Sequence, residues 1–287
     1  MKDKVILLDY GFYLHSAGWC GVANPEMPVS YTCLNMMISD LMKVGVEPED
    51  TIIVGVDYHG EDYSSWRKQY STEYKEGRAK LPIAIYEELN ELHRKIQIST
   101  DWHVILLDHL EYDDIASVAT RYYLEKGKDV VIVSADCDLE QMWCYCDETN
   151  NVKIFSPHKK SKRYKIKPEN FDIYKMLAKK IRKEAKDQVT SEVINENDYD
   201  ERRLIMDLTT LPDWVENLVI ERLDQIEYKE PQIHLLPFQS MREKYNNIYN
   251  DKSKIITYEK SLAIVERKEK LKKAKKKREL AKSNKGE

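Results

Sequence analysis

The chain has 287 residues and a formal net charge of −4, and 42% of its residues are hydrophobic, including 19 tyrosines and 5 tryptophans. This composition excludes a disordered chain, and the length allows one large domain or a domain with an appendage. The start of the chain lacks a signal-peptide pattern, no apolar run approaches a membrane span, and the five cysteines show no CxxC spacing. We therefore expect a cytoplasmic protein, in the host cytoplasm if viral, without a membrane segment, disulfide framework or zinc site.

The charge is divided unevenly along the chain. Residues 252–287 contain 14 lysines and arginines against 5 glutamates, whereas residues 1–251 contain 32 basic and 45 acidic residues. The tail sequence LAIVERKEKLKKAKKKRELAK predicts either a helix with a solvated basic face or a disordered arm, and either form would attract phosphate. A lysine-rich end that only aids solubility explains the same charge equally well.

Four short apolar runs rich in β-branched residues predict buried strands that each end near an acid. These are KVILLDY at 4–10, TIIVGVD at 51–57, HVILLD at 103–108 and DVVIVSAD at 129–136. Apolar residues recur at helical spacing over 31–44 and again over 113–126, where Gly127 can serve as the C-cap. Alternating strands and helices predict an α/β fold with a mostly parallel central sheet and helices on both faces.

The second half of the chain changes character. VKIFS at 152–156 and RYKIK at 163–167 predict a last pair of strands, and from Pro168 onward the pattern is mainly helical. We therefore expect three parts: a core of residues 1–167, a helical C-terminal region of residues 168–250 and a basic tail of residues 251–287.

Acidic side chains recur beyond the carboxyl ends of the predicted strands, and a parallel sheet brings such positions to one edge. They are Asp9, Asp57, Asp136 and Asp138, together with Glu111, Asp113 and Asp114 at the start of the helix after the third strand. Each acid alone is explained by a turn or a helix cap. Their recurrence favours a metal site, because gathered carboxylates repel one another unless cations neutralise them. Oxygen ligands without a His or Cys cluster favour Mg²⁺ or Mn²⁺.

The order of these motifs resembles that of the flap endonuclease and 5′-3′ exonuclease superfamily, whose core has a PIN-like fold. In that superfamily one acid ends the first strand, as Asp9 does, and another ends the second strand, as Asp57 does. The family's Glu-Ala-Asp-Asp motif corresponds to residues 111–114, and its Asp-x-Asp motif corresponds to residues 136–138. Within the superfamily the resemblance is strongest to T-even phage-type ribonuclease H, a group of 5′ nucleases.

The segment that follows Asp57 resembles the arch that surrounds the substrate in this superfamily. It contains WRKQYSTEYKEGRAK, and we place the arch at about 60–82. The family's Tyr-Lys-x-x-Arg signature matches Tyr74, Lys75 and Arg78, so the resemblance implies a catalytic role for Lys75 and Arg78 at the scissile phosphate. The nucleic-acid contacts implied for this segment are Trp66, Arg67, Tyr74, Lys75 and Arg78, of which Trp66 and Arg67 also suit the base of the arch.

The family's Gly-Asp-x-x-Asp-Asn motif, which binds the second metal ion, is altered in this chain. Residues 183–188 read KEAKDQ, so Glu184 and Asp187 stand at the two acidic positions, three residues apart on one face of a helix. The helix-hairpin-helix that follows in the family is reduced to a short stretch before Asp198. A solvated, charged helix face is the alternative explanation for Glu184 and Asp187.

The resemblance implies a two-metal 5′ nuclease that uses Mg²⁺, with Mn²⁺ able to substitute. The first ion is assigned to Asp9, Asp57, Glu111, Asp114 and Asp136, and the second to Asp138, Glu184 and Asp187. Asp113 is assigned to supporting these ligands or to capping its helix. The implied partners are a DNA or RNA–DNA duplex with a 5′ end or flap, and single-strand-binding or sliding-clamp proteins at the basic tail, with the protein itself a monomer away from membranes.

Two other functions remain open at this point. A PIN-type ribonuclease that cuts single-stranded RNA would share the core acids but lack the arch. A non-catalytic nucleic-acid-binding replication protein would keep the fold and lose the second metal site.

Overall fold

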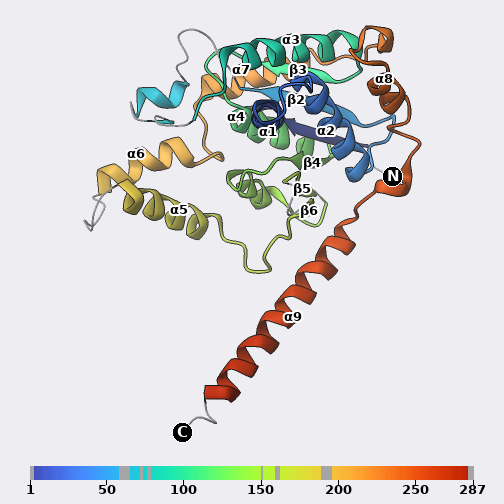
Figure 1. Cartoon of the computed structure of the whole chain (residues 1–287). Coiled ribbons are helices and arrows are strands. Elements are labelled where there is room, and N and C mark those ends of the chain that lie inside the picture. The colour runs from blue at the N-terminus through green and yellow to red at the C-terminus, as the bar shows by residue number, and fades with distance from the viewer. Residues whose placement is uncertain are drawn as a thin grey trace.

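A six-stranded sheet with the strand order β3-β2-β1-β4-β5-β6 forms the centre of the molecule (Figure 1). The computed structural model describes residues 3–57, 65–71, 74–75, 79–149, 151–158, 162–188 and 196–283, and within them it leaves out the side chains of 183–188, 196–199, 269 and 276–283. The strands are β1 (Lys4–Asp9), β2 (Thr51–Val56), β3 (His103–Leu106), β4 (Asp129–Val133), β5 (Val152–Ser156) and β6 (Arg163–Tyr164). Only β6 is antiparallel to its neighbour. The predicted strands are confirmed, although β6 has two residues where five were predicted.

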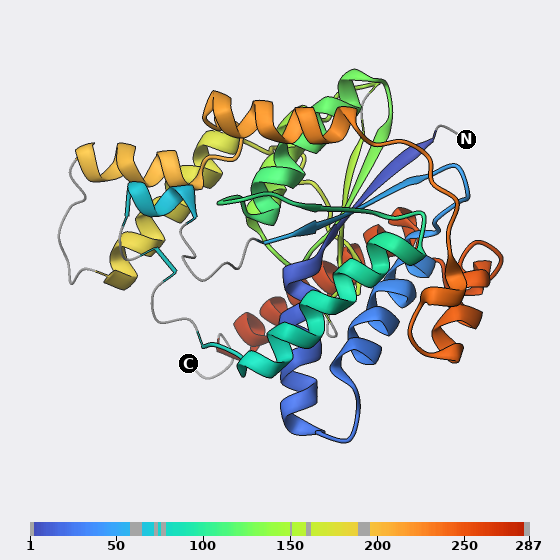
Figure 2. The ribbon, with the colours of Figure 1, turned by 90° about the horizontal axis from the view of Figure 1, so that it is seen from above.

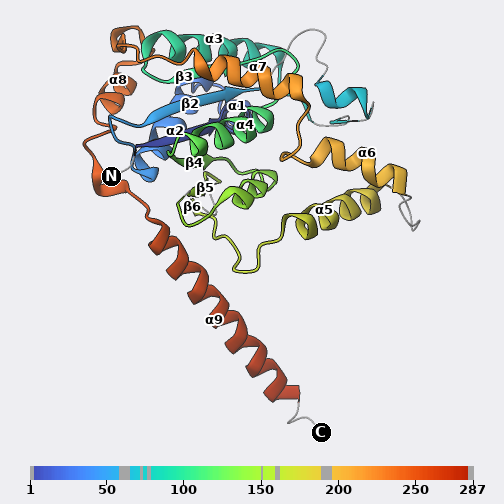
Figure 3. The same ribbon diagram turned by 180° about the vertical axis from the view of Figure 1, so that it is seen from behind.

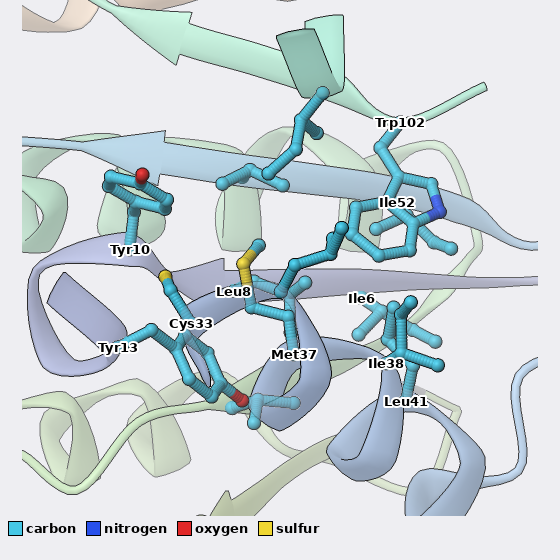
Figure 4. Packing of buried hydrophobic residues seen from close by; sticks show 14 of the residues in the cluster. Ile6, Leu8, Tyr10, Tyr13, Cys33, Met37, Ile38, Leu41, Ile52 and Trp102 are labelled. Carbon is cyan, nitrogen blue, oxygen red and sulfur yellow. The ribbon is translucent and has the colours of Figure 1, made fainter. Parts of the chain in front are cut away.

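Helices cover both faces of the sheet, as the view from above shows (Figure 2). One face carries α1 (Tyr10–Ala23), α2 (Val29–Val44), α3 (Ile83–Ser99) and α8 (Gln239–Asn246), and the other carries α4 (Tyr112–Glu125), η2 (Asp138–Tyr145) and α7 (Asp213–Asp224). Successive side chains of β1 enter opposite cores, with Ile6 and Leu8 in one cluster and Val5 and Leu7 in the other. Figure 4 shows side chains of the first cluster packed around Met37. Burial on both faces explains the continuous apolar runs of the parallel strands.

Of the helices α1 to α4, the sequence predicts α2 and α4 but not α1 and α3. The expected helices over 31–44 and 113–126 correspond to α2 and α4, and each is followed by a glycine with positive φ, Gly45 at 67° and Gly127 at 74°. The sequence does not predict α1 or α3. Helix α1 escapes detection because it starts directly after β1 and because its exposed face also carries apolar residues, such as Trp19 and Val22, so it lacks a polar stripe.

The region of residues 168–250 does not form a unit of its own. Helices α5 (Ile173–Gln188) and α6 (Glu196–Met206) lie side by side and stand away from the sheet (Figures 1 and 3). In contrast, α7 packs against α4 through Val215 and Val219, and α8 adds Met241 and Tyr245 to the core on the opposite face. Only the α5–α6 pair is therefore separate from the core. The remaining short helices are η1 (Trp66–Gln69), η3 (Ile233–Leu235) and η4 (Lys252–Lys254).

The basic tail forms the long helix α9 (Tyr258–Ser283), which is one of the two forms that the sequence allows. Its first turn docks on β6, where the Tyr164 backbone N–H donates to Ser261 Oγ at 3.1 Å and the Tyr164 and Tyr258 rings lie 6.1 Å apart. Beyond that turn α9 runs away from the sheet (Figure 1). None of the helices in the described ranges combines the length and apolar content needed to cross a membrane.

Candidate metal centre

The ends of β1, β2 and β4 bring Asp9, Asp57 and Asp136 to one edge of the sheet. Asp9 is the last residue of β1 and also the N-cap of α1, because its Oδ1 accepts a hydrogen bond from the Phe12 backbone N–H at 2.9 Å. Ser134 joins the first and third of these acids, since its Oγ donates to Asp9 Oδ2 at 2.6 Å and accepts from the Asp136 backbone N–H at 3.0 Å. The strand ends therefore fix these positions through backbone and hydroxyl donors.

Gly11 leaves a space between the carboxylates of Asp9 and Asp57. A Cβ atom at this position would lie 3.2 Å from Asp57 Oδ2 and 3.3 Å from Asp9 Oδ1, which is tighter than ordinary contact. Asp57 is held on its other side by the backbone N–H of Tyr112, which donates to Oδ1 at 2.7 Å. The missing side chain therefore leaves room for a third group between two carboxylates.

The acids at this edge repel one another. Burial and the neighbouring Asp57 carboxylate raise the pKa of Asp9 from 3.8 to about 7. Burial, together with the carboxylates of Asp136 and Asp9, raises the pKa of Asp113 well above its ordinary value. Asp113, which the sequence analysis assigned to a supporting role, therefore belongs electrostatically with the strand-end acids. A divalent cation would relieve this repulsion, and carboxylate oxygens are the ligands that Mg²⁺ accepts.

The hydrogen bonds of the edge hold the acids apart in the structure as it stands. Within the described ranges, no group of three or more His, Cys, Asp or Glu side chains is already arranged to hold a metal ion. The acids fit a hard cation through their donor chemistry, and Gly11 spares the Asp9 and Asp57 carboxylates the crowding that a Cβ atom would cause between them. Ion binding would draw them away from donors such as Ser134.

Asp114 takes part in a buried ion pair and not in this group. Its carboxylate accepts two hydrogen bonds from the Arg67 guanidinium, Nη1 to Oδ2 at 2.9 Å and Nη2 to Oδ1 at 2.6 Å, and a third from Trp66 Nε1 at 3.1 Å. Oδ2 also accepts from the Glu111 backbone N–H at 3.0 Å, which caps α4. Oδ2 thus accepts three hydrogen bonds and Oδ1 accepts one, so Asp113 is better placed than Asp114 to serve as a ligand, whereas the sequence analysis assigned Asp114 to the first ion.

Trp66 and Arg67, which the sequence analysis placed in the arch segment and among the nucleic-acid contacts, are buried in the structure. Their exposed fractions are 3% and 2%, so neither presents a surface to a substrate. Arg67 Nε donates to the Ile205 carbonyl at 2.9 Å, which ties the arch base to the end of α6. One guanidinium thus joins the arch, the start of α4 and the α5–α6 pair.

Glu111 is held by the part of the arch signature that the structure describes. Its carboxylate accepts from Tyr74 OH at 2.8 Å and lies 2.8 Å from Lys75 Nζ and 3.3 Å from Arg67 Nη1. Although burial acts in the opposite direction, Lys75 and Arg67 hold the pKa of Glu111 below its ordinary value. Lys75 adopts a positive φ of 59°, a backbone conformation that costs energy for a side-chain-bearing residue. The remaining signature residue, Arg78, lies outside the described residues.

Asp138 faces a lysine. It is the first residue of η2, its backbone N–H donates to Asp136 Oδ1 at 2.8 Å, and its carboxylate forms an ion pair with Lys180 on α5. The other two acids assigned to the second ion, Glu184 and Asp187, are positions of α5 whose side chains lie outside the described part of the chain.

Charge compensation therefore divides the predicted acids into two groups. Asp114, Glu111 and Asp138 are each paired with a lysine or arginine. The other four predicted acids, which we call the edge acids, are Asp9, Asp57, Asp113 and Asp136. In the described part of the chain, no lysine or arginine forms an ion pair with an edge acid.

Residues 21–176, more than half of the chain, match the family described as 5′-3′ exonuclease, N-terminal resolvase-like domain. The chain belongs to this family. This exonuclease-family chain is also 24% identical over 203 residues to ribonuclease H of Enterobacteria phage T4, a match that covers 66% of this chain and 63% of the phage protein. The chain thus spans less than two thirds of the length of that relative.

Two solved structures of bacteriophage T5 proteins resemble this exonuclease-family chain. One is a T5 protein co-crystallised with metal ions, with 12% identity and a TM-score of 0.48, covering 86% of this chain and 100% of that chain. The other is a variant of the T5 flap endonuclease in a pseudo-enzyme–product complex with DNA and metal ions, also at 12% identity and a TM-score of 0.48, with the same coverage.

Replacing Arg67 with methionine should lower the free energy of unfolding by about 3–5 kcal/mol, because Asp114 would stay buried without its partner. Urea denaturation measures this change. Lys95 pairs with Glu91 on the surface of α3, where the two side chains are 46% and 56% exposed, so Lys95→Met serves as the control and should cost less than about 1 kcal/mol. Equal losses for the two variants would contradict a structural role for the Arg67 pair.

The edge acids should make the metal-free protein less stable as the pH rises from about 4 to 7. In this interval folded Asp9, with its pKa near 7, keeps a proton that an Asp with the ordinary pKa of 3.8 has lost. The folded state then binds more protons than the unfolded state, so stability falls with rising pH and levels off above pH 7. Mg²⁺ should oppose this loss by neutralising the carboxylates.

Thermal melts between pH 4 and 8, in EDTA or in Mg²⁺, measure the stability of the wild type and of Asp9→Asn. The difference in stability between the two proteins isolates the contribution of Asp9. In EDTA the wild type should lose stability relative to the variant as the pH rises. A difference that stays constant with pH would rule out the raised pKa.

Proposed function

We propose that this protein is a Mg²⁺-dependent 5′ nuclease, a 5′-3′ exonuclease or flap endonuclease, acting on DNA or RNA–DNA duplexes that carry a 5′ end or flap. Removal of RNA primers or flaps during DNA replication is the setting that fits such an activity. The observation that carries the proposal is the group of edge acids, with which no lysine or arginine of the described residues forms an ion pair. Next to this group, residues of the predicted arch segment are anchored at the start of α4. Family membership supplies the class of chemistry.

The edge acids Asp9, Asp57, Asp113 and Asp136 would hold a Mg²⁺ ion, with Mn²⁺ able to substitute. When bound, such an ion makes a coordinated water more acidic and places positive charge against a phosphate oxygen. In the overall reaction one water adds across a P–O bond of the backbone: the hydroxyl joins phosphorus, and a proton goes to the leaving oxygen. The products are a phosphate monoester and a free hydroxyl.

Lys75 and Arg78 would meet the scissile phosphate, as the family signature implies. The role is supported by the ion pair of Lys75 with Glu111, which is the N-cap of α4 and lies two residues before Asp113 in the chain. A lysine held beside the edge acids can stabilise charge that develops on a phosphate oxygen. Glu111 is then a positioning residue that keeps the Lys75 ammonium at the edge of the site.

The two alternative functions fit the structure less well. A ribonuclease for single-stranded RNA would have no need of an arch, and the anchoring of Arg67, Tyr74 and Lys75 in the predicted arch segment supports a nuclease that has one. A purely binding protein would gain nothing from edge acids whose repulsion destabilises the fold.

Cleavage assays with four labelled substrates test the proposal: a 5′ flap, a nicked duplex, an RNA–DNA hybrid and single-stranded RNA, each with Mg²⁺ or EDTA. We expect Mg²⁺-dependent cleavage of the duplex-containing substrates from the 5′ end. Asp136→Asn should lower the rate at least about 100-fold through loss of charge stabilisation at the phosphate. Asp108, an exposed acid after β3 at the same edge, is the matched control, and Asp108→Asn should leave the rate unchanged. Cleavage of single-stranded RNA alone, or binding without cleavage, would establish one of the two alternatives.

The basic tail should strengthen binding to nucleic acid through α9. Ending the chain after Glu266 removes the exposed basic turns and keeps the turn around Ser261 that docks on β6. Binding of a duplex should weaken, and the slope of log affinity against log salt should become shallower by about 0.9 for each lost phosphate contact. A full-length control changes four lysines to glutamine, Lys268, Lys270, Lys272 and Lys273, and should show the same trend. An unchanged slope would assign the tail to a single-strand-binding or clamp partner, or to solubility.

A further inference from the structure

The ion pair between Asp138 and Lys180 lies at the place where the family resemblance puts a second metal ion. Asp138 is the one ligand assigned to that ion whose side chain the structure describes, and its carboxylate is already neutralised by an ammonium group on α5. A metal ion bound to Asp138 would have to displace Lys180 or accept a positive charge as its neighbour, which is unfavourable at contact distance.

A second lysine reinforces this arrangement. Lys165 Nζ lies 3.1 Å from Glu140, the other acid in the first turn of η2, and donates to the Asp136 carbonyl at 2.7 Å. Both acids that open η2 are therefore paired with lysines from other segments. The described residues at this position do not fit a metal cation, in contrast to the edge acids.

We propose that Lys180 takes the place of a second metal ion, so that a phosphate group of the nucleic acid meets one Mg²⁺ ion at the edge acids and one ammonium group from α5. This proposal rests on the nuclease function proposed above. It assigns phosphate binding to a residue that the family motifs do not include.

The position of Lys180 suits this role. The backbone N–H of its partner Asp138 donates to Asp136 Oδ1 at 2.8 Å, so the residue that holds the ammonium group is hydrogen-bonded to one of the edge acids. The Lys180 and Asp138 side chains are 23% and 35% exposed, so solvent and an incoming phosphate can reach the pair. A lysine ammonium offers a compact charge and three donors, and an anionic phosphate competes well for both.

The alternative is that Lys180 forms an ion pair with Asp138 only until a second metal ion displaces it. The two possibilities predict opposite effects of removing the lysine. If Lys180 replaces the ion, its loss leaves the phosphate without a cation, and more metal does not help. If Lys180 competes with the ion, its loss exposes Asp138, increases metal binding and lowers the Mg²⁺ concentration that activity requires.

Counting bound Mn²⁺ ions by electron paramagnetic resonance tests the site without relying on activity. The wild type should bind one ion, Asp136→Asn should weaken this binding at least tenfold, and Asp138→Asn should leave the affinity within about threefold of wild type. Two ions bound to the wild type, or loss of one ion in Asp138→Asn, would overturn the role of Lys180. A wild type that cleaves no substrate would instead overturn the proposed nuclease, so the two failures can be told apart.

Lys180→Met tests the phosphate contact itself. We expect the rate of cleavage to fall at least about 100-fold at every Mn²⁺ or Mg²⁺ concentration, with one Mn²⁺ ion still bound, and Lys180→Arg to restore part of the rate. Lys179→Met removes the same charge from the adjacent, exposed position of α5 and should stay within about threefold of wild type. Circular dichroism confirms that each variant is folded. Cleavage by Lys180→Met near the wild-type rate, or its recovery together with a second bound Mn²⁺, would refute the proposal.

Discussion

Charge compensation among carboxylates is the constraint on which the rest of this structure depends. A parallel sheet gathers the acids that end its strands, and each acid at that edge must either find a cation in the protein or remain costly to ionise. Arg67 supplies the cation for Asp114, Lys75 for Glu111 and Lys180 for Asp138. The edge acids form no ion pair with a lysine or arginine of the described residues, and among them Asp9 has its pKa raised to about 7 and Asp113 has its pKa raised well above the ordinary value. The ion pairs therefore indicate which acids form the metal centre better than the positions of the acids at the strand ends do.

The same pairing explains how the arch is attached. Two of the described segments of the predicted arch region are fixed at the start of α4, one through Arg67 on Asp114 and the other through Tyr74 and Lys75 on Glu111. Arg67 also reaches the end of α6, so the arch base and the α5–α6 pair share one anchor. Any change in the position of α4 would therefore be transmitted to the arch, to α5 and to the edge acids together. A buried ion pair suits this task because its geometry is specific, even where its contribution to stability is small.

The sequence predicts the framework of this site but not its division of roles. The acids at the strand ends and the arch signature can be recognised from the order of residue types along the chain. Whether Asp113 or Asp114 faces the metal centre depends on which one meets Arg67, whose position 47 residues from Asp114 in the chain gives no local signal. Gly11 and Ser134 are visible in the sequence beside Asp9 and Asp136, but their roles depend on the approach of other strands. Periodicity and motif spacing do not show which residues of distant segments pair with one another, and these pairs decide the roles in the site.

Replacing a metal ion by a lysine changes what the neighbouring segment must provide. A second metal ion needs several carboxylates held at close range, which is what the family's Gly-Asp-x-x-Asp-Asn motif and the helix-hairpin-helix behind it supply. An ammonium group needs only one acid to orient it, and Asp138 fulfils that need. With the demand for ligands reduced, KEAKDQ suffices at the positions that resemble the family motif, and α5 and α6 suffice to hold Lys180. The altered motif, the short helical pair and the ion pair at Asp138 thus have a single physical explanation.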